Sequence, residues 1–315
     1  MPRVIRTKEV PPKPQIPRDA SGIPRRPGYD VVHDAWLEIV TPVFGGGAVS
    51  RVFDTDRLVN EKSIRGQLRF WWRLVVGVKE FGTSFEAMFR REEEIFGSAE
   101  FPSPTIVEVF QEPCAESGTL TATQNGIDRA GRSTLEWADS RYNFSRIDPQ
   151  MYALFSAAQD SRPEKAAELY KAGHRFRLRI QAAQVSRLER MREIQNKGRG
   201  SHKLPPITDI TGDITKALTA WVLLGGVGSR TRRGVGSLAP IGWTIDESEL
   251  KSLFGVEVFV MSNPCRDAAQ AWGEAVKVYQ GYRQQRTGPR GRSLWPEPDS
   301  LRTVSGCTLP RHSTP

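Results

Sequence analysis

The most regular alternation of apolar and polar residues in this chain runs from His174 to Ile180. Successive side chains of a strand point to opposite faces, so the alternation predicts a β-strand with one apolar face. The other face carries a row of three arginines, Arg175, Arg177 and Arg179. Such a row suits either a polyanion or a sheet surface covered by ion pairs, and the sequence leaves both readings open.

A helical spacing of apolar residues follows Ser63, which is a good N-cap residue. At about 100° per residue, one narrow stripe holds Ile64, Leu68, Trp71 and Val75 and is expected to face the core. A neighbouring face holds Arg65, Arg69, Trp72 and Arg73. Guanidinium and indole groups stack on bases and pair with phosphates, so this face is predicted to contact RNA or a partner subunit.

The remaining periodic segments complete an α+β pattern. Strands are predicted for residues 35–40, 105–110 and 235–245, and helices for residues 85–96, 207–224 and 266–286. The mixed charges of the 85–96 helix predict a solvated face. Residues 111–148 show no period and are expected to form a long insertion.

Two glycine-rich segments separate these elements, at residues 44–48 and 225–237. Glycine lets a backbone approach a ligand closely, so the loop Gly45, Gly46 and Gly47 is a candidate contact. The 225–237 segment lacks the Gly-Lys-Ser/Thr of a Walker loop and lies between a helix and a strand, the reverse of a dinucleotide site. Either it lies flat against a sugar-phosphate strand, or its glycines serve packing alone.

Basic residues are abundant: 45 Lys and Arg stand against 36 Asp and Glu in 315 residues, a net charge of +9. This favours an anionic partner, with a soluble basic enzyme as the alternative. Residues 187–203 are predicted to form a basic hairpin or disordered finger. Residues 1–30 hold seven prolines and are expected to be a basic, extended arm.

The three cysteines are isolated, so neither a zinc site nor a disulfide framework is expected. No apolar run approaches the roughly 18 residues that span a membrane, and the N-terminus lacks an apolar signal core. A cytoplasmic protein without a cofactor is therefore expected.

Several of these segments resemble the RAMP superfamily of CRISPR proteins. The resemblance rests on residues 41–47, the doubled tryptophan within residues 63–73, residues 95–98 and the Ser-Arg-Thr-Arg-Arg-Gly run within residues 224–237. Within that superfamily, they are most similar to the first-numbered subunit of the type III-B Cmr effector complex.

The resemblance implies a ferredoxin-like, RRM-related domain, here residues 31–245, with residues 246–315 as a short helical segment of a partial second domain. It implies a non-catalytic subunit that holds the 3′ region of a CRISPR guide RNA, helps capture complementary target RNA and contacts other Cmr subunits. The candidate RNA contacts are Arg65, Arg69, Trp72, Arg73, Gly45, Gly46, Gly47, Arg187, Arg190, Lys197, Arg199, Lys203, Gly226, Gly228, Arg230, Arg232, Arg233 and Gly234.

An enzyme remains the alternative. Related RAMP subunits cut RNA with an aspartate in the loop after the first strand, and Asp54 and Asp56 lie in such a loop here. Either carboxylate could hold a divalent metal in an endoribonuclease, or simply cap a turn. The four histidines are scattered, so a histidine general base is a weaker hypothesis.

Overall fold

The computed structural model describes a large part of the chain, namely residues 18, 22, 26–45, 52–99, 101–115, 118–120, 122–127, 133–137, 149–154, 167–196, 208–245, 252–253 and 264–284. Most of the predicted arm at residues 1–30 lies outside these ranges.

The elements follow one another as β1 (Tyr29–Ile39), β2 (Val43–Phe44), α1 (Glu61–Trp72), the π-helix η1 (Arg73–Gly77), α2 (Val78–Phe81), α3 (Phe85–Phe96), β3 (Thr105–Gln111), β4 (Thr119–Leu120), β5 (Ala122–Ile127), β6 (Ser133–Trp137), α4 (Pro149–Leu154), β7 (Leu169–Tyr170), β8 (Arg175–Ala183), α5 (Val185–Asn196), α6 (Thr211–Leu224), the 3₁₀ helix η4 (Thr231–Arg233), β9 (Leu238–Ile241) and α8 (Ala268–Gln284).

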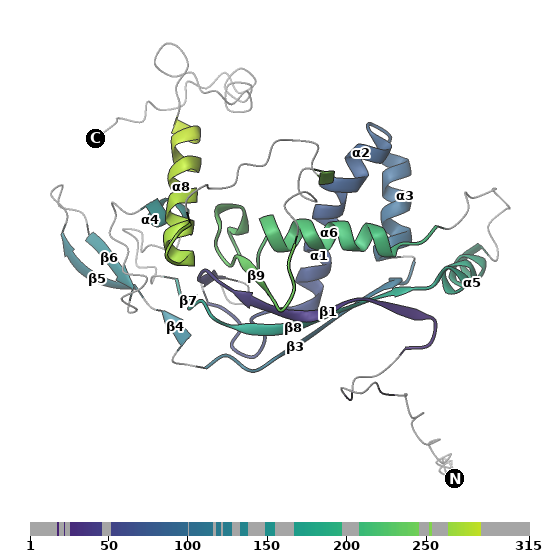
Figure 1. Ribbon diagram of the computed structural model, residues 1–315, viewed down its shortest axis with the longest axis horizontal. Coiled ribbons are helices and arrows are strands. Elements are labelled where there is room, and N and C mark those ends of the chain that lie inside the picture. The colour runs from purple at the N-terminus through teal and green to yellow at the C-terminus, as the bar shows by residue number, and fades with distance from the viewer. Residues whose placement is uncertain are drawn as a thin grey trace, which may run out of the picture.

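The largest sheet has four antiparallel strands in the order β3-β8-β1-β9. Along the chain, its strands and the two helices packed on it run β1-α1-β3-β8-α6-β9, which is the ferredoxin-like βαββαβ arrangement. Helices α1 and α6 cover one face of this sheet (Figure 1). The α+β prediction is therefore confirmed.

Strand β8 shows why the sheet forms where the alternation predicted it. Phe176, Leu178 and Ile180 are fully buried beneath the helices, and the three arginines point to the opposite face. Strand β9 is shorter than predicted. It contains Pro240, which a sheet tolerates at an edge because no neighbour needs the missing N–H group.

Helix α1 begins earlier than predicted, because Asn60 rather than Ser63 caps it. The Asn60 side chain accepts a hydrogen bond from the Lys62 backbone N–H at 2.8 Å. Asn is as good an N-cap as Ser, and Glu61 in the first turn suits the positive end of the helix dipole.

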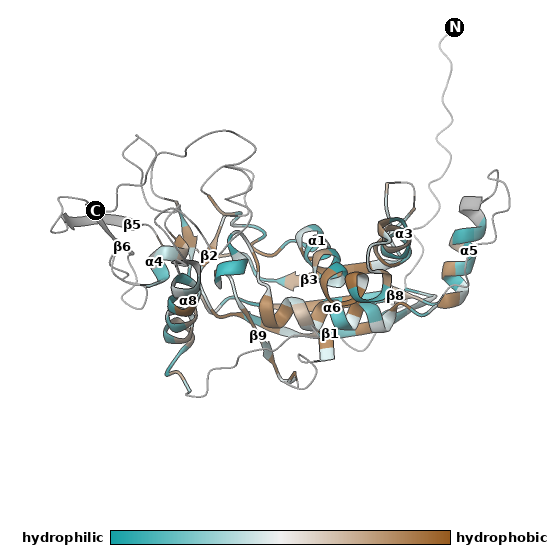
Figure 2. Ribbon diagram, turned by 90° about the horizontal axis from the view of Figure 1, so that it is seen from above, coloured by the Kyte–Doolittle hydropathy of each residue, from teal (hydrophilic) through white to brown (hydrophobic). Residues whose placement is uncertain are grey.

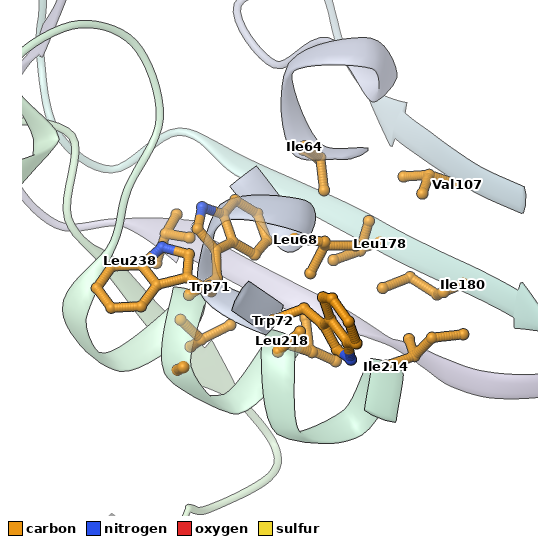
Figure 3. Packing of buried hydrophobic residues seen from close by; sticks show 14 of the residues in the cluster. Ile64, Leu68, Trp71, Trp72, Val107, Leu178, Ile180, Ile214, Leu218 and Leu238 are labelled. Atoms are coloured by element: carbon orange, nitrogen blue, oxygen red, sulfur yellow. The ribbon is translucent and has the colours of Figure 1, made fainter. Parts of the chain in front are cut away.

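The position of Trp72 differs from the sequence prediction. It was expected on an exposed arginine-bearing face, but its side chain is 0% exposed. Its ring lies against Phe81 and Phe96, with centroids 6.4 and 6.5 Å away, and it points into the core beside α6 (Figure 3). The buried face of α1 is wider than one stripe because α3 packs along its side, so Trp72 cannot stack on RNA.

A second, smaller core lies beside the main one. It joins a three-stranded sheet, β2-β7-β4, to helices α4 and α8, through Leu120, Leu154, Leu169, Val235 and Trp272. Strands β4, β5 and β6 fall in the 111–148 segment, where the sequence shows no period, so that prediction was incomplete. The predicted helix near residues 266–286 is confirmed as α8.

Within the described ranges, no helix is long and apolar enough to cross a membrane.

Trp72→Ala is expected to lower the free energy of unfolding by about 3–5 kcal/mol, because it empties a large, fully enclosed space. Phe85→Ala is the matched control, since this aromatic side chain is 72% exposed and should change stability by less than about 0.5 kcal/mol. Urea unfolding of the two variants provides the comparison. Unchanged stability of Trp72→Ala would instead support the sequence prediction that this side chain is exposed.

Candidate nucleic-acid interface

The glycine-arginine loop, residues 225–237, is bonded to the segment that follows β1. Backbone N–H groups of Ser229 and Gly236 donate to the carbonyls of Phe44 and Pro42, at 2.7 and 2.9 Å. The Thr41 hydroxyl donates to the Gly234 carbonyl at 2.7 Å and accepts from another N–H of the loop. The structure thus joins two glycine-rich segments that lie far apart in the sequence into one rigid unit.

Glycine is needed in this loop because its neighbours leave no room for a side chain. A Cβ on Gly226 would come 2.5 Å from the Gly236 carbonyl oxygen, and one on Gly228 would come 2.9 Å from that of Phe44. At Gly234 it would meet the Trp272 ring at 2.7 Å, and at Gly45 the Ser229 hydroxyl at 2.8 Å. These glycines therefore permit close packing of the loop, whether or not their backbone also meets a ligand.

The arginines of the loop form a small cationic cluster. Arg230 is the only described non-glycine residue with positive φ, at 61°, a conformation that costs about 1 kcal/mol. Partial burial and the neighbouring Arg233 guanidinium lower the pKa of Arg230. Neighbouring guanidinium groups repel each other, and a bound anion would reduce such repulsion.

Helices α4 and α8 support this cluster. The Arg230 and Arg233 guanidinium groups approach the carbonyls of Ala153 and Tyr152 at 3.5 Å, at the carboxyl end of α4. Arg233 also lies over the Tyr152 ring, 5.7 Å from its centroid. Trp272 Nε1 of α8 donates to the Arg233 carbonyl at 2.8 Å. Sequence reasoning missed Tyr152 and Trp272 as supports, because aromatic residues in such helices are ordinary core residues.

The remaining arginine of the loop, Arg232, is exposed in the turn of η4. Its charge adds to those of Arg230 and Arg233, so three cationic side chains extend from one short turn of backbone. This concentration of charge on a rigid loop is what a phosphate strand would bind.

The α1 arginines do not join this cluster. Arg73 makes a two-point ion pair with Glu92 of α3, in which one guanidinium nitrogen lies 2.7 Å from Oε1, and that bond raises the pKa of Arg73. Arg69 lies 3.5 Å from the same carboxylate and donates to the carbonyls of Phe96 and Gly97. Glu92 is 3% exposed, so the predicted solvated face of this helix is wrong at that position.

These two arginines therefore join α3 to the continuous helix that α1 and η1 form. Arg65, the remaining predicted cation of the helix, is half-buried. Removing an arginine from a buried carboxylate leaves an unpaired charge, so Arg69 and Arg73 have a structural function that the sequence prediction did not include.

Arg187 and Arg190 lie in α5, so the predicted hairpin or disordered finger is wrong for this part of the segment. Its Arg, Glu, Leu and Met residues are good helix formers. Arg187 stacks over the Tyr29 ring at 4.6 Å. Helices α5 and α8 lie at opposite ends of the long axis (Figure 2), so these cations are remote from the loop that Trp272 supports. The predicted contacts Gly46, Gly47, Lys197, Arg199 and Lys203 lie outside the described residues.

Of the two carboxylates proposed for catalysis, that of Asp54 stabilises a turn. Asp54 Oδ1 accepts hydrogen bonds from the backbone N–H groups of Asp56 and Arg57, at 3.0 and 3.1 Å. In the part of the chain that the structure describes, no three His, Cys, Asp or Glu residues gather to hold a metal ion. Burial lowers the pKa values of His33 and His174, which lie far apart along the chain.

Comparison with known proteins identifies the family. The sequence model of the RAMP superfamily matches residues 36–239. The chain therefore belongs to the RAMP superfamily. It is similar to CRISPR system Cmr subunit Cmr1-2 of Pyrococcus furiosus, with 25% identity over 215 residues that cover 67% of this chain and 94% of that protein.

Solved structures show weaker likenesses. Apo Cmr1 from Pyrococcus furiosus aligns with 90% of this chain and 78% of its own, with a TM-score of 0.48 and 17% identity. A chain of the type III-B Cmr-beta complex bound to cognate target RNA aligns with 66% of this chain and 53% of its own, with a TM-score of 0.36 and 18% identity.

Gly228→Ala is expected to lower the free energy of unfolding by about 1–3 kcal/mol, because φ is +80° and the new methyl group would press on Val43 and Phe44. Gly212→Ala is the control: it lies in α6 with nothing within 4 Å, and alanine there should be neutral or stabilising. Thermal unfolding compares the two. Full stability in Gly228→Ala together with abolished RNA binding would mean that the glycine faces a ligand rather than β2.

Proposed function

We propose that this chain is a non-catalytic, cytoplasmic RNA-binding subunit of a type III-B CRISPR effector complex. In this proposal it holds the 3′ region of the guide RNA and helps capture the complementary target RNA beside other subunits. The observation that carries the proposal is the cationic loop: three arginines, Arg230, Arg232 and Arg233, on a backbone locked to the segment after β1.

The chemistry of that loop suits a ribose-phosphate strand. Guanidinium groups pair with phosphate oxygens in two-point geometry, and such contacts position RNA without reading its sequence. The three arginines of one short turn give the loop a local positive charge, which favours an anionic ligand. Base pairing between guide and target would then supply sequence choice.

Membership in the RAMP superfamily and the name of a relative support the same assignment. The similar protein of Pyrococcus furiosus is named as a subunit of a CRISPR Cmr system. The matched residues 36–239 fall inside the proposed RAMP domain, residues 31–245. Helix α8, from the proposed C-terminal segment 246–315, acts as a support for the loop through Trp272.

Replacing Arg230, Arg232 and Arg233 together by Ala should weaken binding of single-stranded RNA about equally for unrelated sequences. The negative slope of log K against log salt should become less steep by roughly 0.7 for each phosphate that no longer meets a guanidinium group. Binding titrations at several salt concentrations measure both quantities. Arg57→Ala, Lys79→Ala and Arg90→Ala in one chain remove the same formal charge from other exposed positions and should have little effect. If both triple variants weaken RNA binding equally, the loop contributes only through the net charge of the protein and is not a specific RNA site.

Asp54→Ala should leave target cleavage by the assembled complex unchanged, because the Asp54 carboxylate is engaged by two backbone N–H groups. Removing this carboxylate should instead cost about 1 kcal/mol of stability, as for other turn and cap carboxylates. Cleavage assays with reconstituted complex provide the test, with Asp56→Ala alongside. Abolished cleavage in Asp54→Ala, with assembly intact, would make this subunit a metal-dependent nuclease.

A further inference from the structure

The face of the four-stranded sheet opposite α1 and α6 carries two exposed aromatic side chains. Trp36 of β1 is 47% exposed and Phe110 of β3 is 37% exposed. Both are paired in register with Arg177 of β8, so Phe110, Arg177 and Trp36 form one row across three strands. Residues directly opposite each other on antiparallel strands point to the same face. The two rings therefore lie on one surface, about 10 Å apart.

The arginines of β8, which lie between and beside these rings, form ion pairs with carboxylates of β1. Arg177 makes a two-point bond to Asp34, with nitrogen–oxygen distances of 2.6 and 2.9 Å. Arg175 bonds Glu38 at 2.8 Å, and Arg179 lies 3.8 Å from Asp34. The ion-paired reading of the β8 arginines is thus confirmed.

A cleft of about 660 Å³ opens at the end of this row. Trp36 and Phe110 form part of its lining, together with Tyr170, Lys171, His174 and Arg175. Its size lies within the range of small-molecule sites, and it is large enough for a nucleotide. Arg175 remains 64% exposed in spite of its bond to Glu38, so its guanidinium can still meet a phosphate.

The cleft adjoins the proposed RNA loop through paired strands. Tyr170 of β7, which lines the cleft, pairs with Val43 of β2. The next residue of β2, Phe44, accepts the backbone hydrogen bond from Ser229 of the loop. The strand that lines the cleft is therefore paired with the strand that is bonded to the cationic loop.

We propose that Trp36 and Phe110 form a stacking platform for unpaired bases of single-stranded RNA, and that the cleft receives one nucleotide beside Arg175. The proposal rests on the proposed function and adds a second kind of contact to it. Base–aromatic stacking tolerates any sequence, because every base has a flat face. RNA is the occupant favoured here because β7, which lines the cleft, pairs with the strand bonded to the cationic loop, and because Lys171 and Arg175 border the cleft beside a single carboxylate, Glu112.

The test uses the full-length chain and a mixed-sequence single-stranded RNA oligonucleotide at several salt concentrations. Trp36→Ala and Phe110→Ala should each weaken binding about 5- to 100-fold, as expected when one stacked ring is removed. Because stacking releases no counterions, the salt slope should stay at the wild-type value. This signature separates the platform from the loop, whose arginine variants change the slope.

Phe85→Ala and Phe89→Ala are the matched controls, since these rings are exposed on α3 and should leave affinity unchanged. Trp36→Phe keeps an aromatic face and should retain most of the affinity, whereas Trp36→Leu keeps apolar bulk and should not. This pair decides the question if an alanine variant fails to fold. Photo-crosslinking of 5-bromouridine RNA should label peptides that contain Trp36 or Phe110.

Wild-type affinity in the Trp36 and Phe110 variants, with binding abolished in the loop variant, would overturn the platform and leave the proposed function standing. Failure of the wild-type chain and its assembled complex to bind RNA would overturn both. Normal RNA binding without entry into the complex would assign the rings to a protein contact and overturn the platform as well.

Discussion

Backbone hydrogen bonds between the segment after β1 and the glycine-arginine loop are the constraint on which the candidate site depends. The loop N–H groups of Ser229 and Gly236 reach Phe44 and Pro42 because glycines let the two backbones come into contact. This contact fixes the loop relative to the sheet before any ligand binds. Thr41 strengthens it by bonding both a carbonyl and an N–H group of the loop. Arginines mounted on such a loop lose little backbone entropy on binding, which favours affinity.

The elements of the main fold could be predicted from periodicity, because burial against a sheet imposes it. Helix α3 matches its predicted bounds, and β8 matches in its alternation. The burial of Trp72 could not be predicted, because it depends on a neighbour that lies across α1. One helical stripe predicts one packed face, whereas α1 packs against α6 and the sheet and is flanked by α3. Helix α5 was missed because charge alone does not distinguish a solvated helix from a disordered segment.

The candidate site could be predicted in part, for a reason that applies to arginine in general. A sequence shows where guanidinium groups are, but their partners come from elsewhere in the fold. Arg73 is bound by Glu92, and Arg177 is bound by Asp34, a residue 143 positions away. In the loop, Arg230 and Arg233 approach the backbone carbonyls of Ala153 and Tyr152, which lie 77 and 81 positions away along the chain. Tyr152 and Trp272 became visible as supports only once the second core was seen.

In the proposed arrangement, the cationic loop and the aromatic platform would contribute different kinds of interaction with RNA. Charge on the loop attracts phosphate over a distance of about 10 Å at moderate salt, but it weakens as salt rises. Aromatic faces act only on contact, and they keep their strength when charge is screened. Trp36 points outward because Leu37 and Ile39 are buried on the other face of β1. What the sequence could not imply is that β8 brings Phe110 into the same row, because strand register is a property of the folded sheet. A strand of RNA that lies on both surfaces would be attracted at long range by the cations and held at short range by stacking on the rings.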